Sequence, residues 1–390
     1  MNIKEINDKY VMNTYGKFNL QLDEGLNAVC WNENGKKFID FTSGIGVNSL
    51  GFCNKIWLDA VIKQASSLQH TSNLYYTKPS AMLAQSLCLA TGYTNVFFAN
   101  SGAEANEGAI KLARKYSFDK YGLGRHNIIC LNNSFHGRTL STLSATGQDV
   151  FHNYFFPFVE GFLFAEANNF ESVKKLADST VCAVMLEVIQ GEGGVNALNK
   201  AFVEDVSNLC QQKDWLLIVD EVQTGVGRTG AILASEHYKI KPDVTTLAKG
   251  LGGGLPIGAI LANEKCSKVL GTGTHATTFG ANPVICAGAL AVFNTIKKKE
   301  FLMEVCDKSD FMRQEILKMK GVKGVSGKGL MIGIELKNNN AKDVVNECVE
   351  KGLLCLTAKE KIRLLPPLSI TYDEICEGLA ILSKVLSSIN

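Results

Sequence analysis

Five short apolar stretches of the chain each end on polar or small residues. The stretches are Asn95–Ala99, Asn127–Leu131, Val181–Ile189, Leu216–Val219 and Val244–Leu247. Short runs that are apolar throughout are typical of strands buried on both faces of a parallel sheet, and their alternation with helical patterns indicates βαβ units. The pattern predicts an α/β fold with a mostly parallel sheet, in which ligands collect beyond the carboxyl ends of the strands.

The last hundred residues have a different pattern. Their expected elements are a helix over Val284–Lys299, a turn at Ser326–Gly329, strands at Leu330–Leu336, Leu353–Leu356 and Ile362–Leu365, and helices at Lys342–Lys351 and after Thr371. Strands and helices mixed in this way are typical of a smaller α+β domain. A chain of 390 residues is long enough for two domains.

Composition argues against several classes of protein. A formal net charge of +2 indicates no basic surface for nucleic acid or anionic membrane. The 12 cysteines form no C-x-x-C pair and the 6 histidines form no H-E-x-x-H motif, so neither a disulfide framework nor a metal site is expected. No apolar run approaches the roughly 20 residues of a membrane span, and Glu187 interrupts the stretch Val181–Ile189. Without a secretory leader, a cytoplasmic location is expected.

Lys249 stands two residues after the expected strand Val244–Leu247 and precedes a glycine-rich turn that begins at Gly250. Glycines allow a bulky ligand to approach the backbone, and a lysine at this place can act as an amine nucleophile. A lysine beside glycines is more often a solvated loop residue. The functional interpretation therefore depends on the residues that other strand ends supply.

Two other strand ends carry chemically suggestive residues. Ser101 and Glu104 follow Asn95–Ala99 and fit a capping box, S-x-x-E, at a helix start; an ordinary cap and a phosphate site are both consistent with it. Phe135 and Arg138 follow Asn127–Leu131. They suit stacking on a flat ring and pairing with a carboxylate, although a core aromatic and a surface cation remain the plainer alternatives.

One motif suggests a different class. Gly225–Gly230 matches G-x-G-x-x-G and so suggests a dinucleotide-binding oxidoreductase. Four residues separate it from Asp220 at the strand end, so its glycines do not lie at the strand-to-helix junction, and the carboxylates of Asp220 and Glu221 would repel a pyrophosphate there. Pyridoxal phosphate explains more of the pattern, because it needs a lysine, an acid for its pyridine nitrogen, a phosphate site and a stacking aromatic.

With these residues, the sequence resembles the class III (subgroup II) pyridoxal-phosphate aminotransferases, and more narrowly the bacterial acetylornithine aminotransferases. The resemblance is strongest at Leu217–Gly225 and at Lys249 after Leu247-Ala248, and it extends from Tyr15 to Leu368. It implies a fold type I transferase, with a large domain over 51–282 and a small domain made of 1–50 and 283–390. It also implies a homodimer with shared active sites.

The resemblance also assigns roles. Lys249 forms the Schiff base with the cofactor and moves protons, Asp220 pairs with the pyridine nitrogen, and the cofactor-binding set is Ser101, Gly102, Ala103, Phe135, Asp220, Glu221, Val222, Gln223, Lys249 and Thr278. Thr278 is expected to reach the neighbouring subunit's cofactor. Arg138 is expected to bind the substrate carboxylate, with Thr277 nearby.

The implied reaction converts N-acetyl-L-ornithine and 2-oxoglutarate to N-acetyl-L-glutamate 5-semialdehyde and L-glutamate, in a ping-pong sequence. Arg363 is expected to bind the α-carboxylate of glutamate, and Glu192 to pair with Arg363 when the ω-amine is bound; a fixed structural ion pair is the alternative. Ornithine, succinyldiaminopimelate and 4-aminobutyrate aminotransferases remain alternatives for the substrate. An oxidoreductase or a non-catalytic cofactor-binding regulator remains possible in principle.

Overall fold

A seven-stranded sheet forms the centre of the computed structural model, which describes residues 2–338 and 340–389. In spatial order its strands are β4 (Asn95–Ala99), β12 (Gly258–Ala262), β11 (Val244–Leu247), β10 (Leu216–Asp220), β7 (Val181–Leu186), β5 (Asn127–Leu131) and β6 (Phe162–Ala165). β12 runs in the opposite direction to the other six strands of this sheet. The predicted mostly parallel α/β sheet is confirmed.

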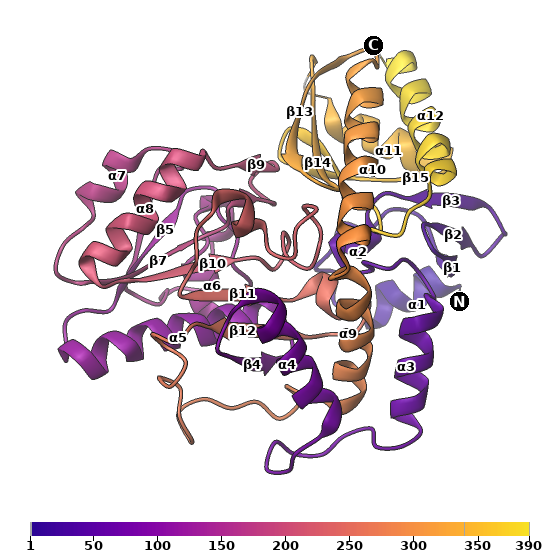
Figure 1. Ribbon diagram of the computed structural model, residues 1–390. Coiled ribbons are helices and arrows are strands. Elements are labelled where there is room, and N and C mark those ends of the chain that lie inside the picture. Colours follow the sequence, from indigo (N-terminus) through magenta and orange to yellow (C-terminus); the bar gives the residue numbers. More distant parts are fainter. Residues whose placement is uncertain (1, 339, 390) are drawn as a thin grey trace.

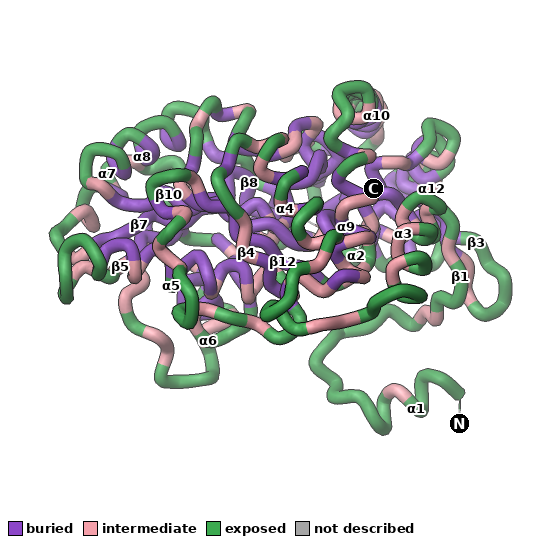
Figure 2. The backbone as a smooth tube through the Cα atoms, turned by 60° about the horizontal axis from the view of Figure 1, so that its bottom comes forward, coloured by how far each residue is buried: buried purple, intermediate pink, exposed green. Residues whose placement is uncertain are grey.

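Helices cover both faces of this sheet (Figure 1). They include α4 (Lys78–Thr91), α5 (Gly102–Tyr121), α6 (Leu140–Ser144), α7 (Phe170–Lys175) and α8 (Lys200–Lys213). Neighbouring residues of β7 pack on opposite faces of the sheet. Val184 packs in the cluster that contains Val203 of α8, whereas Met185 packs in the cluster that contains Ala109 of α5. Burial of both faces explains why the strand is apolar throughout, and the strands lie among the buried parts of the tube in Figure 2.

The other strands of the described residues form three smaller sheets. One contains β1 (Leu22–Leu26), β2 (Val29–Asn32), β3 (Lys37–Asp40) and β15 (Leu353–Leu354); another contains β13 (Val322–Lys328), β14 (Met331–Leu336), β17 (Lys361–Leu364) and β16 (Leu356–Ala358); the third pairs β8 (Ile189–Gln190) with β9 (Asn196–Ala197). Leu353 of β15 pairs in parallel with Ile39 of β3. Segments from both ends of the chain therefore share one sheet.

The remaining helices lie around these sheets. They are α1 (Ile3–Tyr10), α2 (Ser43–Gly46), α3 (Lys55–Ala65), α9 (Pro283–Ile296), α10 (Lys299–Leu317), α11 (Ala341–Lys351) and α12 (Tyr372–Ile389), with short 3-10 turns η1 (Asp149–Phe151), η2 (Ala234–Tyr238) and η3 (Lys249–Leu251). Among the residues described, no helix is long and apolar enough to cross a membrane.

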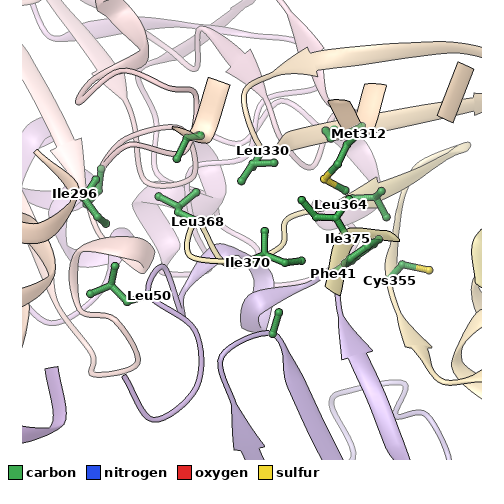
Figure 3. Packing of buried hydrophobic residues seen from close by; sticks show 14 of the residues in the cluster. Phe41, Leu50, Ile296, Met312, Leu330, Cys355, Leu364, Leu368, Ile370 and Ile375 are labelled. Atoms are coloured by element: carbon green, nitrogen blue, oxygen red, sulfur yellow. The ribbon is translucent and has the colours of Figure 1, made fainter. Parts of the chain in front are cut away.

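Early and late parts of the chain also share a core. Phe41, Leu50 and Leu330 are buried in one cluster with Leu368 and Ile370 (Figure 3). Residues more than three hundred positions apart along the chain therefore pack together, as a domain built from both termini requires. The boundaries at 51 and 282 remain a prediction.

Several predicted elements of the carboxyl-terminal part were wrong. The predicted turn at Ser326–Gly329 lies largely in β13, where Ser326 pairs with Gly333 of β14. The predicted strand Leu353–Leu356 is two short strands in different sheets, because β15 pairs with β3 while β16 pairs with β17. The helix predicted from Val284 to about Lys299 is present as α9 and ends at Ile296, and α10 follows it directly, with Lys298 as an extended N-cap residue.

Candidate active site

A cavity of about 480 Å³ lies at the carboxyl ends of the central strands. It brings together most of the predicted cofactor and substrate residues, which are Ser101, Gly102, Ala103, Phe135, Arg138, Asp220, Val222, Gln223 and Lys249. These residues come from the ends of β4, β5, β10 and β11, so the parallel sheet gathers side chains that the sequence separates by more than a hundred positions. The cavity thus occupies the place where α/β sheets bind ligands.

Lys249 lies just beyond β11, where the backbone turns sharply. Its φ of +36° is in the left-handed region that non-glycine residues rarely adopt, and such strain is concentrated at functional sites. Burial lowers the pKa of the Lys249 amine from its usual value; the guanidinium of Arg363 acts in the same direction, and the carboxylates of Glu192 and Asp220 oppose it. A lowered pKa increases the fraction of neutral amine, which is the nucleophilic form.

Asp220 is held rigidly at the end of β10. Its Oδ2 accepts hydrogen bonds from Asn106 Nδ2 at 2.7 Å and from His136 Nδ1 at 2.8 Å, and its Oδ1 accepts from the Val222 backbone N–H at 3.0 Å. Asn106 is fixed in turn by the hydroxyl of Thr246, which donates to Asn106 Oδ1 at 2.7 Å. This arrangement presents a carboxylate of fixed orientation to the cavity.

Sequence reasoning missed Asn106 and His136. Both carried a usable signal: Asn106 stands four residues after Gly102 and therefore on the same face of α5, and His136 directly follows Phe135. His136 is buried, and its Nε2 has no hydrogen-bond partner among the described residues. Asn106 and His136 line the cavity beside Asp220.

The amino terminus of α5 forms one wall. Ser101 caps the helix by accepting a hydrogen bond from the Glu104 backbone N–H at 3.1 Å. The predicted reciprocal half of the capping box is absent from this described turn, because Glu104 Oε2 instead accepts from the backbone N–H of Asn100 at 2.7 Å. The N–H groups of Gly102 and Ala103 belong to the first helical turn, which has no intrahelical acceptors, so they are available to an anion.

Gly102 is required by close packing at this wall. A Cβ atom at this position would lie 2.8 Å from Cγ1 of Val222. Val222 in turn lines the cavity next to Asp220. The backbone of α5 therefore approaches the end of β10 more closely than a larger residue would allow.

Glu187 lines the cavity and joins two loops. Its carboxylate accepts hydrogen bonds from the backbone N–H of Phe135 at 2.9 Å and of Gly191 at 3.3 Å. Burial raises the pKa of Glu187 to about 7, with His136 lowering it and Asp220 raising it. The sequence signal for this residue was an acid within an otherwise apolar stretch.

Arg363 and Glu192 form an ion pair next to this site. Arg363 lies on β17 and is 3% exposed, and its guanidinium donates to Glu192 Oε1 at 2.6 Å. Gln223 contacts both, with Nε2 3.4 Å from Glu192 Oε1 and Oε1 3.4 Å from the Arg363 guanidinium. Burial raises the pKa of Glu192, but Arg363, together with Lys249 and Gln223, more than offsets this effect, and the pKa is lowered. Arg363 and Glu192 do not line the cavity themselves.

Three other predicted residues also lie outside the cavity. The Glu221 carboxylate accepts hydrogen bonds from the backbone N–H groups of Ala234 at 2.6 Å and Ser235 at 2.9 Å, so it fixes η2 and does not face the site. Thr277 accepts a hydrogen bond from Asn100 Nδ2 at 2.9 Å, and Thr278 is exposed on the same loop. Thr278 therefore does not line the cavity of its own chain.

The G-x-G-x-x-G segment is packed against helices. A Cβ at Gly227 would lie 2.3 Å from Ile296 of α9, and one at Gly230 would lie 2.3 Å from Sγ of Cys306 in α10. The segment does not open a helix, so it lacks the helix N-terminus to which a dinucleotide-binding turn presents its pyrophosphate.

Comparison with known proteins identifies the family, since the model for "Aminotransferase class-III" matches residues 10–386. The chain belongs to the class III aminotransferases. It is 53% identical over 387 residues to an acetylornithine aminotransferase from Haemophilus ducreyi, covering 99% of this chain and 98% of that protein.

Solved structures of other aminotransferases are also similar to this chain. The N-acetylornithine aminotransferase of Stenotrophomonas maltophilia has a TM-score of 0.86 at 33% identity, covering 99% of this chain and 98% of that one. The ornithine aminotransferase of Toxoplasma gondii has a TM-score of 0.94 at 30% identity, covering 99% and 94%.

The residues of the cavity fit the pyridoxal phosphate that class III aminotransferases use. The first turn of α5 offers free N–H groups for a phosphate, and Phe135 offers an aromatic face. Asp220 offers a carboxylate for a protonated ring nitrogen and Lys249 an amine for a carbonyl group. Among the described residues no cluster of three or more His, Cys, Asp or Glu is arranged to hold a metal ion.

Proposed function

We propose that this protein transfers the terminal amino group of N-acetyl-L-ornithine to 2-oxoglutarate, giving N-acetyl-L-glutamate 5-semialdehyde and L-glutamate. The observation that carries the reaction type is a lysine amine of lowered pKa and a fixed carboxylate, Lys249 and Asp220, in one cavity with a helix N-terminus. The choice of donor rests on the near full-length similarity to an acetylornithine aminotransferase.

Each of the cavity residues has a distinct proposed role in the reaction. When bound, pyridoxal phosphate supplies an electron sink for the bond that breaks at the amine-bearing carbon. Lys249 would hold and move the proton at its Nζ, and the fixed Asp220 carboxylate would keep the ring nitrogen protonated, because an adjacent negative charge favours the cationic form. Phe135 would stack on the ring, Gln223 would bond its oxygen, and Ser101, Gly102 and Ala103 would hold the phosphate.

Two arginines accommodate the two substrates. N-Acetyl-L-ornithine presents its terminal amine and keeps its α-carboxylate remote, so its carboxylate suits Arg138 at the cavity wall, with Thr277 nearby. Glutamate must bring its α-carboxylate next to the reacting carbon, where Arg363 binds it once Glu192 releases the guanidinium. The Glu192–Arg363 pair then acts as a gate that is closed for the ω-amine and open for the α-amine.

The assembly and location belong to the same proposal. We propose a homodimer in which Thr278 reaches the phosphate of the neighbouring subunit's cofactor, since its exposed loop does not reach the cavity of its own chain. The large domain spans 51–282, and the small domain combines 1–50 and 283–390. The amino acid and keto acid substrates are small molecules of the cytoplasm, where we place the enzyme.

The deciding experiment is the visible absorption spectrum of the purified protein, recorded without keto acid before and after adding one amine. N-Acetyl-L-ornithine should bleach the cofactor band far faster than L-ornithine or 4-aminobutyrate. Faster bleaching by one of those two amines would keep the reaction and change the donor. No visible band, even after pyridoxal phosphate is added, would refute the proposed function.

A further inference from the structure

Among the described residues, Arg138 interacts with the aromatic rings of Phe135 and Phe151. Its side chain has no hydrogen bond and no ion pair to any residue in the described part of the chain, although it lines the cavity. Its guanidinium carbon lies 4.2 Å from the ring centroid of Phe151 and 5.6 Å from that of Phe135. Both distances are within the range of cation–π attraction, and Phe151 is the closer partner.

An aromatic partner has a specific advantage at a carboxylate-binding arginine. A carboxylate or carbonyl partner within the protein would occupy the N–H donors that the substrate needs, and a substrate would have to displace it. An aromatic face attracts the guanidinium charge without supplying a competing acceptor. Phe151 therefore restricts the motion of Arg138 while leaving its donors free.

The segment that carries Phe151 is itself fixed to the loop that carries Phe135. The Asn133 backbone N–H donates to Gly147 O at 2.6 Å, and Gln148 Nε2 donates to Ser134 O at 3.1 Å. The Phe151 backbone N–H then donates to Gln148 O at 3.0 Å and closes the turn η1. Two rings at a fixed separation thus define where the guanidinium lies.

The two rings contact each other as well. Their centroids are 5.7 Å apart, with an interplanar angle of 73°, which is the favourable edge-to-face arrangement. Phe135 also lines the cavity, where its ring is proposed to stack on the cofactor. Phe151 does not line the cavity, and its ring can serve Arg138 alone.

We propose that Phe151 is a positioning residue for the amino donor: its ring holds the Arg138 guanidinium in the place that receives the substrate α-carboxylate. This inference rests on the proposed function, because it requires a donor whose carboxylate is remote from the reacting amine. Losing the ring leaves Arg138 charged but free to sample other rotamers, so donor binding weakens while the chemical step is kept.

The test compares Phe151→Leu with Phe151→Tyr in the holoenzyme. We expect Phe151→Leu to raise the KM for N-acetyl-L-ornithine by about 2-fold to 5-fold, the range of a cation–π contact of an exposed side chain, with kcat nearly unchanged. Phe151→Tyr keeps the aromatic face and should restore the wild-type KM. Phe155→Leu in the same loop is the matched control, because Phe155 is exposed and its ring contacts Tyr154.

A second measurement separates positioning from a general structural effect. N-(4-Aminobutyl)acetamide is the same donor without its carboxylate, and its dissociation constant should not change in Phe151→Leu. In an Arg138→Gln background, Phe151→Leu should add no further loss of N-acetyl-L-ornithine binding. Equal weakening of both compounds, or an undiminished effect in that background, would overturn the proposal. If Phe151→Leu fails to fold, Phe151→Met replaces it in each comparison.

The proposed function can fail independently of this inference. An enzyme that prefers another carboxylate-bearing donor at Arg138 would still show the dependence on Phe151 with that donor. Absence of any aminotransferase activity in the wild-type protein would refute the proposed function itself, whereas a normal wild-type enzyme with an unchanged Phe151→Leu variant would refute only the role of Phe151.

Discussion

Replacing Glu192 with glutamine should shift substrate preference toward α-amines. In the proposed mechanism, the α-carboxylate of glutamate pairs with Arg363 only after Glu192 has left its contact of 2.6 Å with Arg363. In Glu192→Gln the guanidinium is unpaired from the start, and the amide can still contact it weakly. The variant therefore removes the free-energy cost of breaking the Glu192–Arg363 ion pair. This cost applies to the binding of glutamate but not to that of N-acetyl-L-ornithine.

The size of this cost follows from burial. Breaking a buried ion pair by removing one partner costs about 3–5 kcal/mol. The Arg363 side chain is 4% exposed, but the Glu192 side chain is 30% exposed, so the lower end of this range applies. Water and the introduced amide recover part of it, which leaves about 1–2 kcal/mol, or roughly 5-fold to 30-fold in kcat/KM for glutamate.

Stopped-flow measurement of each half-reaction provides the assay. The ratio of kcat/KM for glutamate to that for N-acetyl-L-ornithine should rise by this factor in Glu192→Gln. Glu335→Gln is the control, because Glu335 pairs with Lys323 at the same 2.6 Å on the surface. An unchanged ratio in Glu192→Gln would mean that the Glu192–Arg363 pair is structural and does not gate the substrate.

Three further outcomes are expected. Asp220→Asn should lower kcat about 100-fold or more, because a fixed charge is lost from the site, while absorbance still shows bound cofactor; near-normal kcat would contradict the role of this carboxylate. Burial raises the pKa of Glu221 to about 7, so its protonation favours the folded state below pH 4.5 and this contribution is lost as pH rises through 7. Wild-type stability should therefore fall by up to about 3 kcal/mol relative to Glu221→Gln between pH 4.5 and 8, as urea unfolding measures; parallel pH profiles would contradict this. Gly108→Ala places a Cβ 2.3 Å from Ile260 Cδ1 and 3.1 Å from His275 Nε2, and overpacking of about 1–3 kcal/mol should exceed the gain of about 1 kcal/mol in helix propensity, so the Tm should fall.

Much of the central sheet was predictable from local pattern. The strands Asn95–Ala99 and Asn127–Leu131 were predicted with the bounds that the structure has, because an apolar run bounded by polar residues is a local signal. The gathering of Lys249, Asp220 and Phe135 in one cavity also follows from parallel strands, since their carboxyl ends share one edge.

Features that depend on contacts between distant segments were not predictable in this way. Nothing near Leu353 shows that β15 pairs with β3 while the next strand joins another sheet. Likewise, Glu221 stands beside Asp220 in sequence, but successive residues around a strand end face different ways, and its carboxylate turns to η2. Phe151 carried no local signal, because its role depends on where Arg138 lies.

The parallel pairing of Leu353 with Ile39 has a consequence for synthesis on the ribosome. The strand β3 emerges early, yet its neighbour is translated more than three hundred residues later, so one edge of the hairpin formed by β2 and β3 has no partner during most of translation. An unpaired edge can accept strands from other chains. Nascent chains that stall before residue 353 should therefore be prone to aggregation or depend on chaperones, whatever the state of the central sheet.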